Sequence, residues 1–137
     1  MKTLIRNIFV LVCAAIVGAI CNGLLVQVGG QVVPPPAGYD FTTEEGLAAG
    51  MAFMEPKHFV FPFLAHAVGT LISALIIGRF AASRRPMLVL LVSSLFFIGG
   101  VYMVMILPSP MWFNVLDLVL AYFPMGYLGY RIVIRHS

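Results

Sequence analysis

Four long apolar runs occupy most of the chain, and each is long enough to cross a lipid bilayer. They cover approximately residues 4–29, 57–80, 86–107 and 110–131. About twenty consecutive apolar residues are enough for a helix to span the hydrocarbon core of a membrane. Because most connections between the runs are short, the pattern predicts a single-domain, all-α integral membrane protein, built as a four-transmembrane-helix antiparallel bundle.

The loop 30–56 is the one substantial connection between the predicted spans. Thr42 followed by Glu45 is a capping-box pattern, so we expect a short helix that begins near Thr43. Apolar residues then recur at helical spacing, at Leu47, Met51 and Met54. This short helix is therefore predicted to be amphipathic, and it either lies on the membrane surface or packs over the end of the bundle.

The first span also carries two rows of small residues at four-residue spacing. One row consists of Ala15, Ala19 and Gly23, and the other of Ala14 and Gly18. Small side chains let neighbouring membrane helices approach closely, so these rows predict helix–helix contacts.

Composition agrees with this interpretation and excludes a soluble domain. Hydrophobic residues make up 61% of the chain and charged residues only 9%, with a mean hydropathy of +1.03. Globular chains carry about a quarter charged residues.

The sequence pI is about 9.1, but the basic residues stand at span ends and form no patch, so no nucleic-acid partner is predicted. Cys13 and Cys21 lack a CxxC spacing and are interpreted as packing residues.

The basic residues lie almost entirely on one side of the predicted membrane. Those on this side are Lys2, Arg6, Arg79, Arg84, Arg85, Arg131 and Arg135, and only Lys57 lies on the other. Cytoplasmic loops carry an excess of Lys and Arg. We therefore expect a bacterial inner-membrane protein with both termini in the cytoplasm and an extracytoplasmic loop 30–56.

The first apolar run also resembles a signal peptide. Because its largely apolar sequence continues to Val33, we expect this helix to be retained in the protein.

Each predicted span carries a polar residue at a similar depth in its outer half. Counted inward at about 1.5 Å per residue, Asn22, His66, Tyr102 and Asp117 lie roughly 8–12 Å below the outer ends of their spans. Asp117 is the one acid inside a span, and an unpaired charge in lipid is costly, so His66 is its expected partner. An ionisable residue inside a membrane span is by default a functional-site hypothesis.

Further polar residues extend this group. Thr70 lies one helical turn from His66, and Asn114 shares a helix face with Asp117. The predicted rim consists of Glu55 and His58. Together these residues predict an outward-facing polar pocket, with the loop helix as its lid.

The predicted function is binding or translocation of a small polar or ionic ligand, including a proton, at the protonatable pair His66 and Asp117. One alternative is a membrane-embedded enzyme in which Asp117 orients His66 as a general base toward a lipid or small molecule at the outer leaflet. Another is a non-catalytic accessory subunit of a larger membrane complex. The pair can also be a purely structural clasp between helices, since interhelical polar contacts hold bundles in register.

The expected partners are membrane lipid and a small polar ligand. A homo-oligomer or a larger complex also fits, because a single chain offers one half-depth site and no inverted repeat. No cofactor is predicted. A metal site would need Glu55, His58, His66 and Asp117, but the two histidines stand about 12 Å apart along the helix, so no metal site is predicted.

Overall fold

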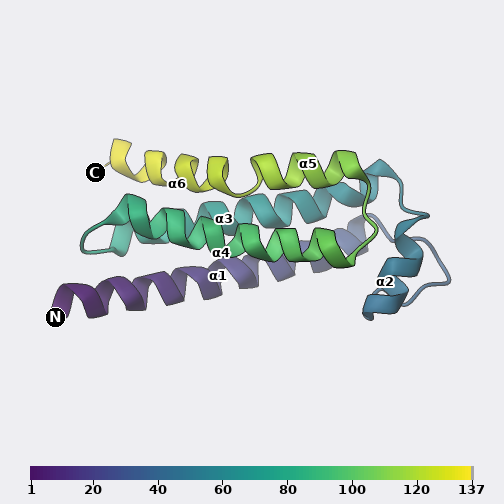
Figure 1. Cartoon of the computed structure of the whole chain (residues 1–137), viewed down its shortest axis with the longest axis horizontal. Helices are drawn as coiled ribbons and strands as arrows, with labels where there is room; N and C mark the ends of the chain where they lie inside the picture. The colour runs from purple at the N-terminus through teal and green to yellow at the C-terminus, as the bar shows by residue number, and fades with distance from the viewer. Residues whose placement is uncertain (137) are drawn as a thin grey trace.

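The computed structural model describes residues 1–136, which form a series of helices (Figure 1). The helices are α1 (Lys2–Val32), α2 (Glu44–Met51), the 3₁₀ helix η1 (Pro56–Phe59), α3 (Val60–Phe80), α4 (Arg85–Ile106), α5 (Met111–Leu120) and α6 (Phe123–Arg135). No strand occurs among the described residues, so the prediction of an all-α protein is confirmed.

Four helical units are long and apolar enough to cross a membrane: α1, η1 with α3, α4, and α5 with α6. They lie side by side, with both termini and the α3–α4 turn at one end and α2 at the other (Figure 1). Large apolar side chains cover the outside, for example Leu95 at 56% exposure and Ile98 at 65%. Such a surface suits hydrocarbon rather than water. These features indicate a multi-pass membrane protein.

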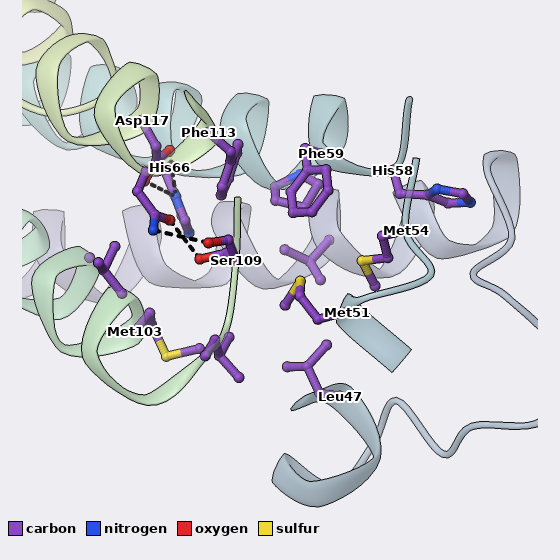
Figure 2. Close-up of a pocket in the computed structure, with 16 residues that line it drawn as sticks. Leu47, Met51, Met54, His58, Phe59, His66, Met103, Ser109, Phe113 and Asp117 are labelled. Atoms are coloured by element: carbon purple, nitrogen blue, oxygen red, sulfur yellow. Dashed lines mark hydrogen bonds and ion pairs between the residues drawn. The ribbon is translucent and has the colours of Figure 1, made fainter. Parts of the chain in front are cut away.

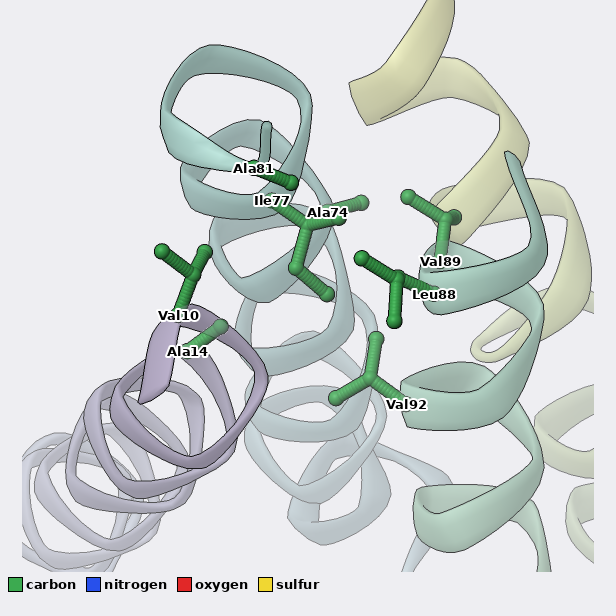
Figure 3. Packing of buried hydrophobic residues seen from close by; sticks show 8 residues of the cluster. All are labelled: Val10, Ala14, Ala74, Ile77, Ala81, Leu88, Val89 and Val92. Atoms are coloured by element: carbon green, nitrogen blue, oxygen red, sulfur yellow. The ribbon is translucent and has the colours of Figure 1, made fainter. Parts of the chain in front are cut away.

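The central helix is α3, which packs against α1 and α6 and also against α4. Near the termini, small and branched side chains from α1, α3, the α3–α4 turn and α4 form a close-packed core (Figure 3). This core consists of Val10, Ala14, Ala74, Ile77, Ala81, Leu88, Val89 and Val92. It fills the half of the molecule that lies away from α2.

The helices α1 and α3 are in close contact where Gly18 lies against Gly69. A Cβ atom on Gly18 would stand 2.6 Å from the Gly69 carbonyl oxygen and would overlap the Ser73 hydroxyl. That hydroxyl donates a hydrogen bond to the Ala14 carbonyl at 2.8 Å. Of the two rows of small residues, the row with Ala14 and Gly18 therefore faces α3, whereas Gly23 has open space around it.

Asn7 ties the start of α1 to the turn between α3 and α4. Its side-chain oxygen accepts hydrogen bonds from the backbone N–H groups of Ala82 at 2.9 Å and Ser83 at 3.3 Å. Its amide nitrogen donates to the carbonyl and the hydroxyl of Ser83. Asn7 is 7% exposed, so these contacts replace those that water would make.

Replacing Asn7 with leucine should lower the free energy of unfolding by about 1–3 kcal/mol, because two backbone N–H groups of the turn lose their acceptor. Thermal or chemical unfolding in detergent measures this loss. Thr3 is exposed on the same helix and serves as the matched position. Thr3→Leu should change stability by less than about 0.5 kcal/mol, and an equal loss in both variants would contradict the proposed role of Asn7.

The loop helix α2 is present, but its N-cap is Thr43 rather than the predicted Thr42. The Thr43 hydroxyl accepts a hydrogen bond from the Gly46 N–H at 3.1 Å. Thr42 instead donates from its hydroxyl and its N–H to the Asp40 carboxylate, and these bonds lower the pKa of Asp40. The N-cap is displaced by one residue because two adjacent threonines offer the same hydroxyl group. The residue three positions after Thr43 is Gly46, which has no side chain to complete the predicted capping box.

The fourth apolar unit consists of two helices. The sequence predicts one span over 110–131, and Pro124 within it predicts a kink. Helix α5 ends at Leu120 and α6 begins at Phe123. Pro124 has no backbone N–H to donate to the Leu120 carbonyl, and its ring clashes with that carbonyl, so a regular helix cannot continue through this point. The break places Tyr122 in the interior, at 2% exposure.

Candidate functional site

A cavity of about 200 Å³ lies between α2 and the adjacent ends of the long helices (Figure 2). We call it the outer cavity. Its wall is mostly apolar, with side chains that include Leu47, Met51, Met54, Phe59, Met103 and Phe113. His66 and Asp117 lie at its inner end. An apolar cavity with a few polar groups is the usual form of a small-molecule site.

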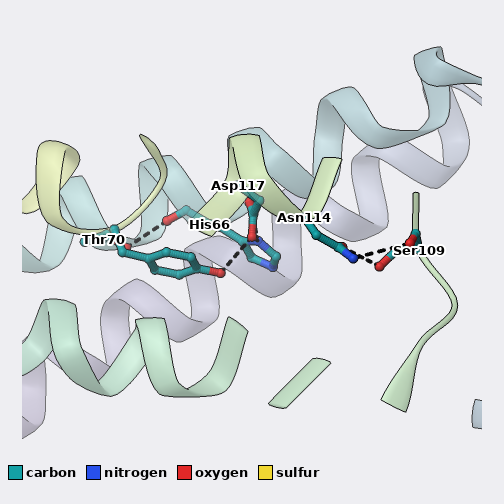
Figure 4. A network of polar contacts seen from close by, with 6 residues as sticks. His66, Thr70, Ser109, Asn114 and Asp117 are labelled. Carbon is teal, nitrogen blue, oxygen red and sulfur yellow. Dashed lines mark hydrogen bonds and ion pairs between the residues drawn. The ribbon is translucent and has the colours of Figure 1, made fainter. Parts of the chain in front are cut away.

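His66 of α3 and Asp117 of α5 contact each other inside the bundle (Figure 4). Nδ1 of His66 lies 2.8 Å from Oδ1 of Asp117 and 2.9 Å from Oδ2. The Asp117 side chain is 4% exposed and that of His66 is 21% exposed. The contact expected from the sequence is thus made, and it joins α3 to α5 through two residues that are 51 positions apart along the chain.

Tyr122 is a third member of this group, and the sequence analysis did not identify it. Its hydroxyl donates a hydrogen bond to Oδ2 of Asp117 at 3.0 Å, and its ring stacks beside the His66 imidazole. In a continuous helix, residues five apart point to different sides. Tyr122 reaches Asp117 because the helix breaks before Pro124, and that proline is the one signal in the sequence that could have identified it.

Two other predicted residues make hydrogen bonds that do not involve the side chains of the pair. The Thr70 hydroxyl donates to the His66 backbone carbonyl at 2.9 Å, within α3. The Asn114 side chain accepts from the Ser109 hydroxyl at 2.6 Å and donates to the Ser109 carbonyl at 3.3 Å, which fixes the turn into α5. Asn114 lines the outer cavity beside Asp117, but its side chain is already used within the protein.

The predicted rim residues connect segments of the backbone at the cavity entrance. The Glu55 N–H donates to Nδ1 of His58 at 2.9 Å, and Nε2 of His58 lies 3.2 Å from the Pro34 carbonyl oxygen. The Glu55 carboxylate pairs with Lys57 at 3.0 Å, on the exposed surface. His58 lines the outer cavity, whereas Glu55 does not.

The second ring nitrogen of His66, Nε2, has no hydrogen-bond partner among the described residues. The pair carries no net charge either as imidazolium with carboxylate or as neutral imidazole with protonated carboxyl. In both arrangements Nε2 carries a hydrogen. A neutral imidazole beside a carboxylate would instead leave a net negative charge among apolar side chains, which is costly. We therefore expect Nε2 to act as a hydrogen-bond donor toward a ligand.

A second cavity, of about 340 Å³, lies on the other side of His66 between α1, α3 and α4. We call it the lateral cavity. Asn22 and Tyr102 line it, whereas Asn114 and Asp117 line the outer cavity. His66 borders both. The single layer of polar groups predicted from the sequence is thus divided between two cavities that meet at His66.

A metal centre has no support in the described part of the chain. Within residues 1–136, no group of three or more His, Cys, Asp or Glu side chains is close enough to hold a metal ion.

Comparisons with protein-family models, with curated proteins and with solved structures found no match to this chain.

Proposed function

We propose that this chain is a bacterial inner-membrane protein that binds a small amphipathic molecule in the outer cavity, with His66 as the polar anchor. Its four apolar units cross the membrane as an antiparallel bundle, with both termini in the cytoplasm. Helix α2 is then an amphipathic lid at the extracytoplasmic end. The charge distribution supports this orientation, because seven of the eight Lys and Arg residues lie at the end that holds the termini.

The observation that supports binding is an ionisable pair at the inner end of an otherwise apolar cavity. Asp117 fixes His66 through Nδ1 and leaves Nε2 without a partner among residues 1–136. The apolar wall suits the body of a ligand, and Nε2 suits a single oxygen acceptor on it. This lining narrows the polar or ionic ligand predicted from the sequence to one with an apolar body and a single polar group.

Binding is better supported than translocation by a single chain. Below the site, the close-packed core of α1, α3 and α4 fills the half of the molecule near the termini. Ser73 lies between the site and that core, but its hydroxyl is used by backbone carbonyls. A polar solute would thus meet apolar side chains without a continuous hydrophilic route, which is costly for any charged species.

The enzyme alternative lacks a second reacting group. Among the described residues, no hydroxyl or thiol forms a hydrogen bond with Nε2 of His66, so no nucleophile is activated there. A donor at Nε2 also differs from the general base that this alternative requires. Asp117 does orient the ring, but orientation serves a binding site equally well.

The test is thermal unfolding of the detergent-solubilised protein with four eight-carbon probes: methyl octanoate, octanol, octylamine and octane. At about ten times its Kd, a ligand should raise Tm by roughly 3–6 °C. We expect methyl octanoate and octanol to stabilise the wild type more than octylamine or octane do, because Nε2 donates.

The comparison variants are His66→Gln in the site and His136→Gln far from it. The shift should disappear in His66→Gln and persist in His136→Gln. If no probe shifts the wild type, or if His66→Gln keeps the same shifts, the pair is a structural clasp and the proposed binding function is wrong.

A further inference from the structure

The lateral cavity is a groove that opens sideways toward the bilayer between α1 and α4. Its floor is buried, at Gly18, Gly69 and Thr70, whereas residues of its rim, such as Leu95 and Tyr102, are 56% and 58% exposed. Helix α1 packs mainly on α3 and much less on α4, so the space between α1 and α4 is left open. In a membrane, this opening faces lipid chains.

Three polar side chains with unused hydrogen-bonding capacity line this groove, each from a different helix. They are the Asn22 amide of α1, the Tyr102 hydroxyl of α4 and Nε2 of His66. None of them has a hydrogen-bond partner among the described residues. Polar groups at membrane depth without partners are costly, since lipid chains cannot hydrogen-bond to them. The arrangement therefore favours the binding of a molecule that brings a polar group into the groove.

All three side chains can donate a hydrogen bond, which suits an oxygen acceptor. The depth of Tyr102 suits an acceptor that belongs to a lipid. Tyr102 lies four residues before the end of α4 at Ile106, about 6 Å along the helix axis. Helix α4 is itself about as long as the hydrocarbon core is thick, so Tyr102 lies near the boundary where lipid ester linkages are found.

We propose that the groove binds one acyl chain of a membrane lipid and that His66, Asn22 and Tyr102 hold its ester carbonyl. The chain lies between α1 and α4, beside Leu95 and over the open position Gly99. This inference rests on the proposed function, because it uses the same anchor, His66, and it names a bilayer lipid as the ligand class. His66, Gly100 and Met103 line both cavities, so the groove is a route from the bilayer to the pair.

The test uses two single-chain probes that differ only in the carbonyl: an oleoyl lysophosphatidylglycerol with an ester linkage and its ether-linked analogue. Binding to the purified protein in detergent is measured by the Tm shift across a concentration series. The ester probe should bind at least about tenfold more tightly than the ether probe, because only the ester offers the acceptor. Equal binding of the two probes would overturn the role of the carbonyl.

The groove itself is tested with Gly99→Trp, matched by Gly23→Trp on α1. A Cβ at either glycine meets open space, so both variants should fold, but only Gly99 lines the groove. Gly99→Trp should abolish the ester preference, and Gly23→Trp should retain it. Tyr102→Phe should reduce the preference severalfold without affecting the fold, because Tyr102 is exposed.

Two outcomes separate this proposal from the proposed function. If Gly99→Trp binds both lysolipids as the wild type does, the groove proposal is wrong, while the eight-carbon probes still report on the outer cavity. If Gly99→Trp changes the oligomeric state in light scattering and no lysolipid shifts the wild type, the groove is an interface between copies of this chain. That result would also overturn the proposal.

Discussion

Replacing His66 with alanine should destabilise the protein by about 3–5 kcal/mol, because it leaves a buried carboxylate without its partner. The Asp117 side chain is 4% exposed, and among the described residues only the Tyr122 hydroxyl would still donate to it. The reverse change, Asp117→Ala, should cost only about 1–2 kcal/mol, the usual value of an interhelical polar contact. The His66 imidazole that remains in this variant is more exposed than the Asp117 carboxylate, and it can exist uncharged. Chemical unfolding in detergent measures both losses.

The double variant His66→Ala with Asp117→Ala distinguishes a stranded charge from a simple cavity. If the stranded carboxylate causes the loss, the double variant should be more stable than His66→Ala alone. If the loss comes from missing volume, the two single losses should add instead. Additive losses would show that the pair contributes packing and little electrostatic interaction.

Replacing Gly18 with leucine should be comparably damaging, with a loss of at least about 3 kcal/mol. The new side chain would have to displace the Gly69 carbonyl and Ser73 rather than the flexible end of a long side chain. Adding volume to a packed interior usually costs 1–3 kcal/mol, and backbone neighbours raise this cost because they cannot rotate away. Thermal unfolding in detergent is the measurement.

Gly23→Leu is the matched control for this prediction. Gly23 lies on the same helix, and a Cβ added there meets nothing within 4 Å. Leucine has a better helix propensity than glycine, so this variant should be neutral or slightly stabilising. Equal destabilisation of the two variants would show that the contact between Gly18 and Gly69 does not determine how α1 packs on α3.

The sequence was sufficient to predict the features that depend on hydrophobicity and length. The four apolar units, the short loop helix and the contact between His66 and Asp117 follow from run lengths, from a capping pattern and from the cost of a lone charge in lipid. These features depend on one residue or one segment at a time. They could therefore be predicted without knowing how the helices pack.

Features that depend on the relative rotation of helices could not be predicted in this way. Tyr122 reaches Asp117 because the helix breaks before Pro124. The spacing of residues in the sequence does not indicate where a side chain points after such a break. Asn7 appears in the sequence as an ordinary polar residue near a helix start, yet it holds the turn at Ala82. The rotation of α1 against α3 likewise decides that Gly18 is buried and Gly23 exposed.

Depth counting also placed Asn22 and Tyr102 in the same layer as the pair, but it carried no information about direction. A helix residue at the right depth can face any neighbour, and these two face the lateral cavity rather than Asp117. The sequence was thus sufficient to predict the depth of these polar residues. It could not show that they line two separate cavities, with His66 bordering both.

The chain order of the pair has a consequence for biogenesis. Synthesis runs from the N-terminus, so α3 with His66 is complete before Asp117 is made, 51 residues later. During that interval the group that waits in the bilayer is an imidazole, which can stay uncharged until its partner arrives. With the two residues exchanged, the nascent protein would hold an unpaired carboxylate in lipid, at the stage when it has the fewest helices to shield it.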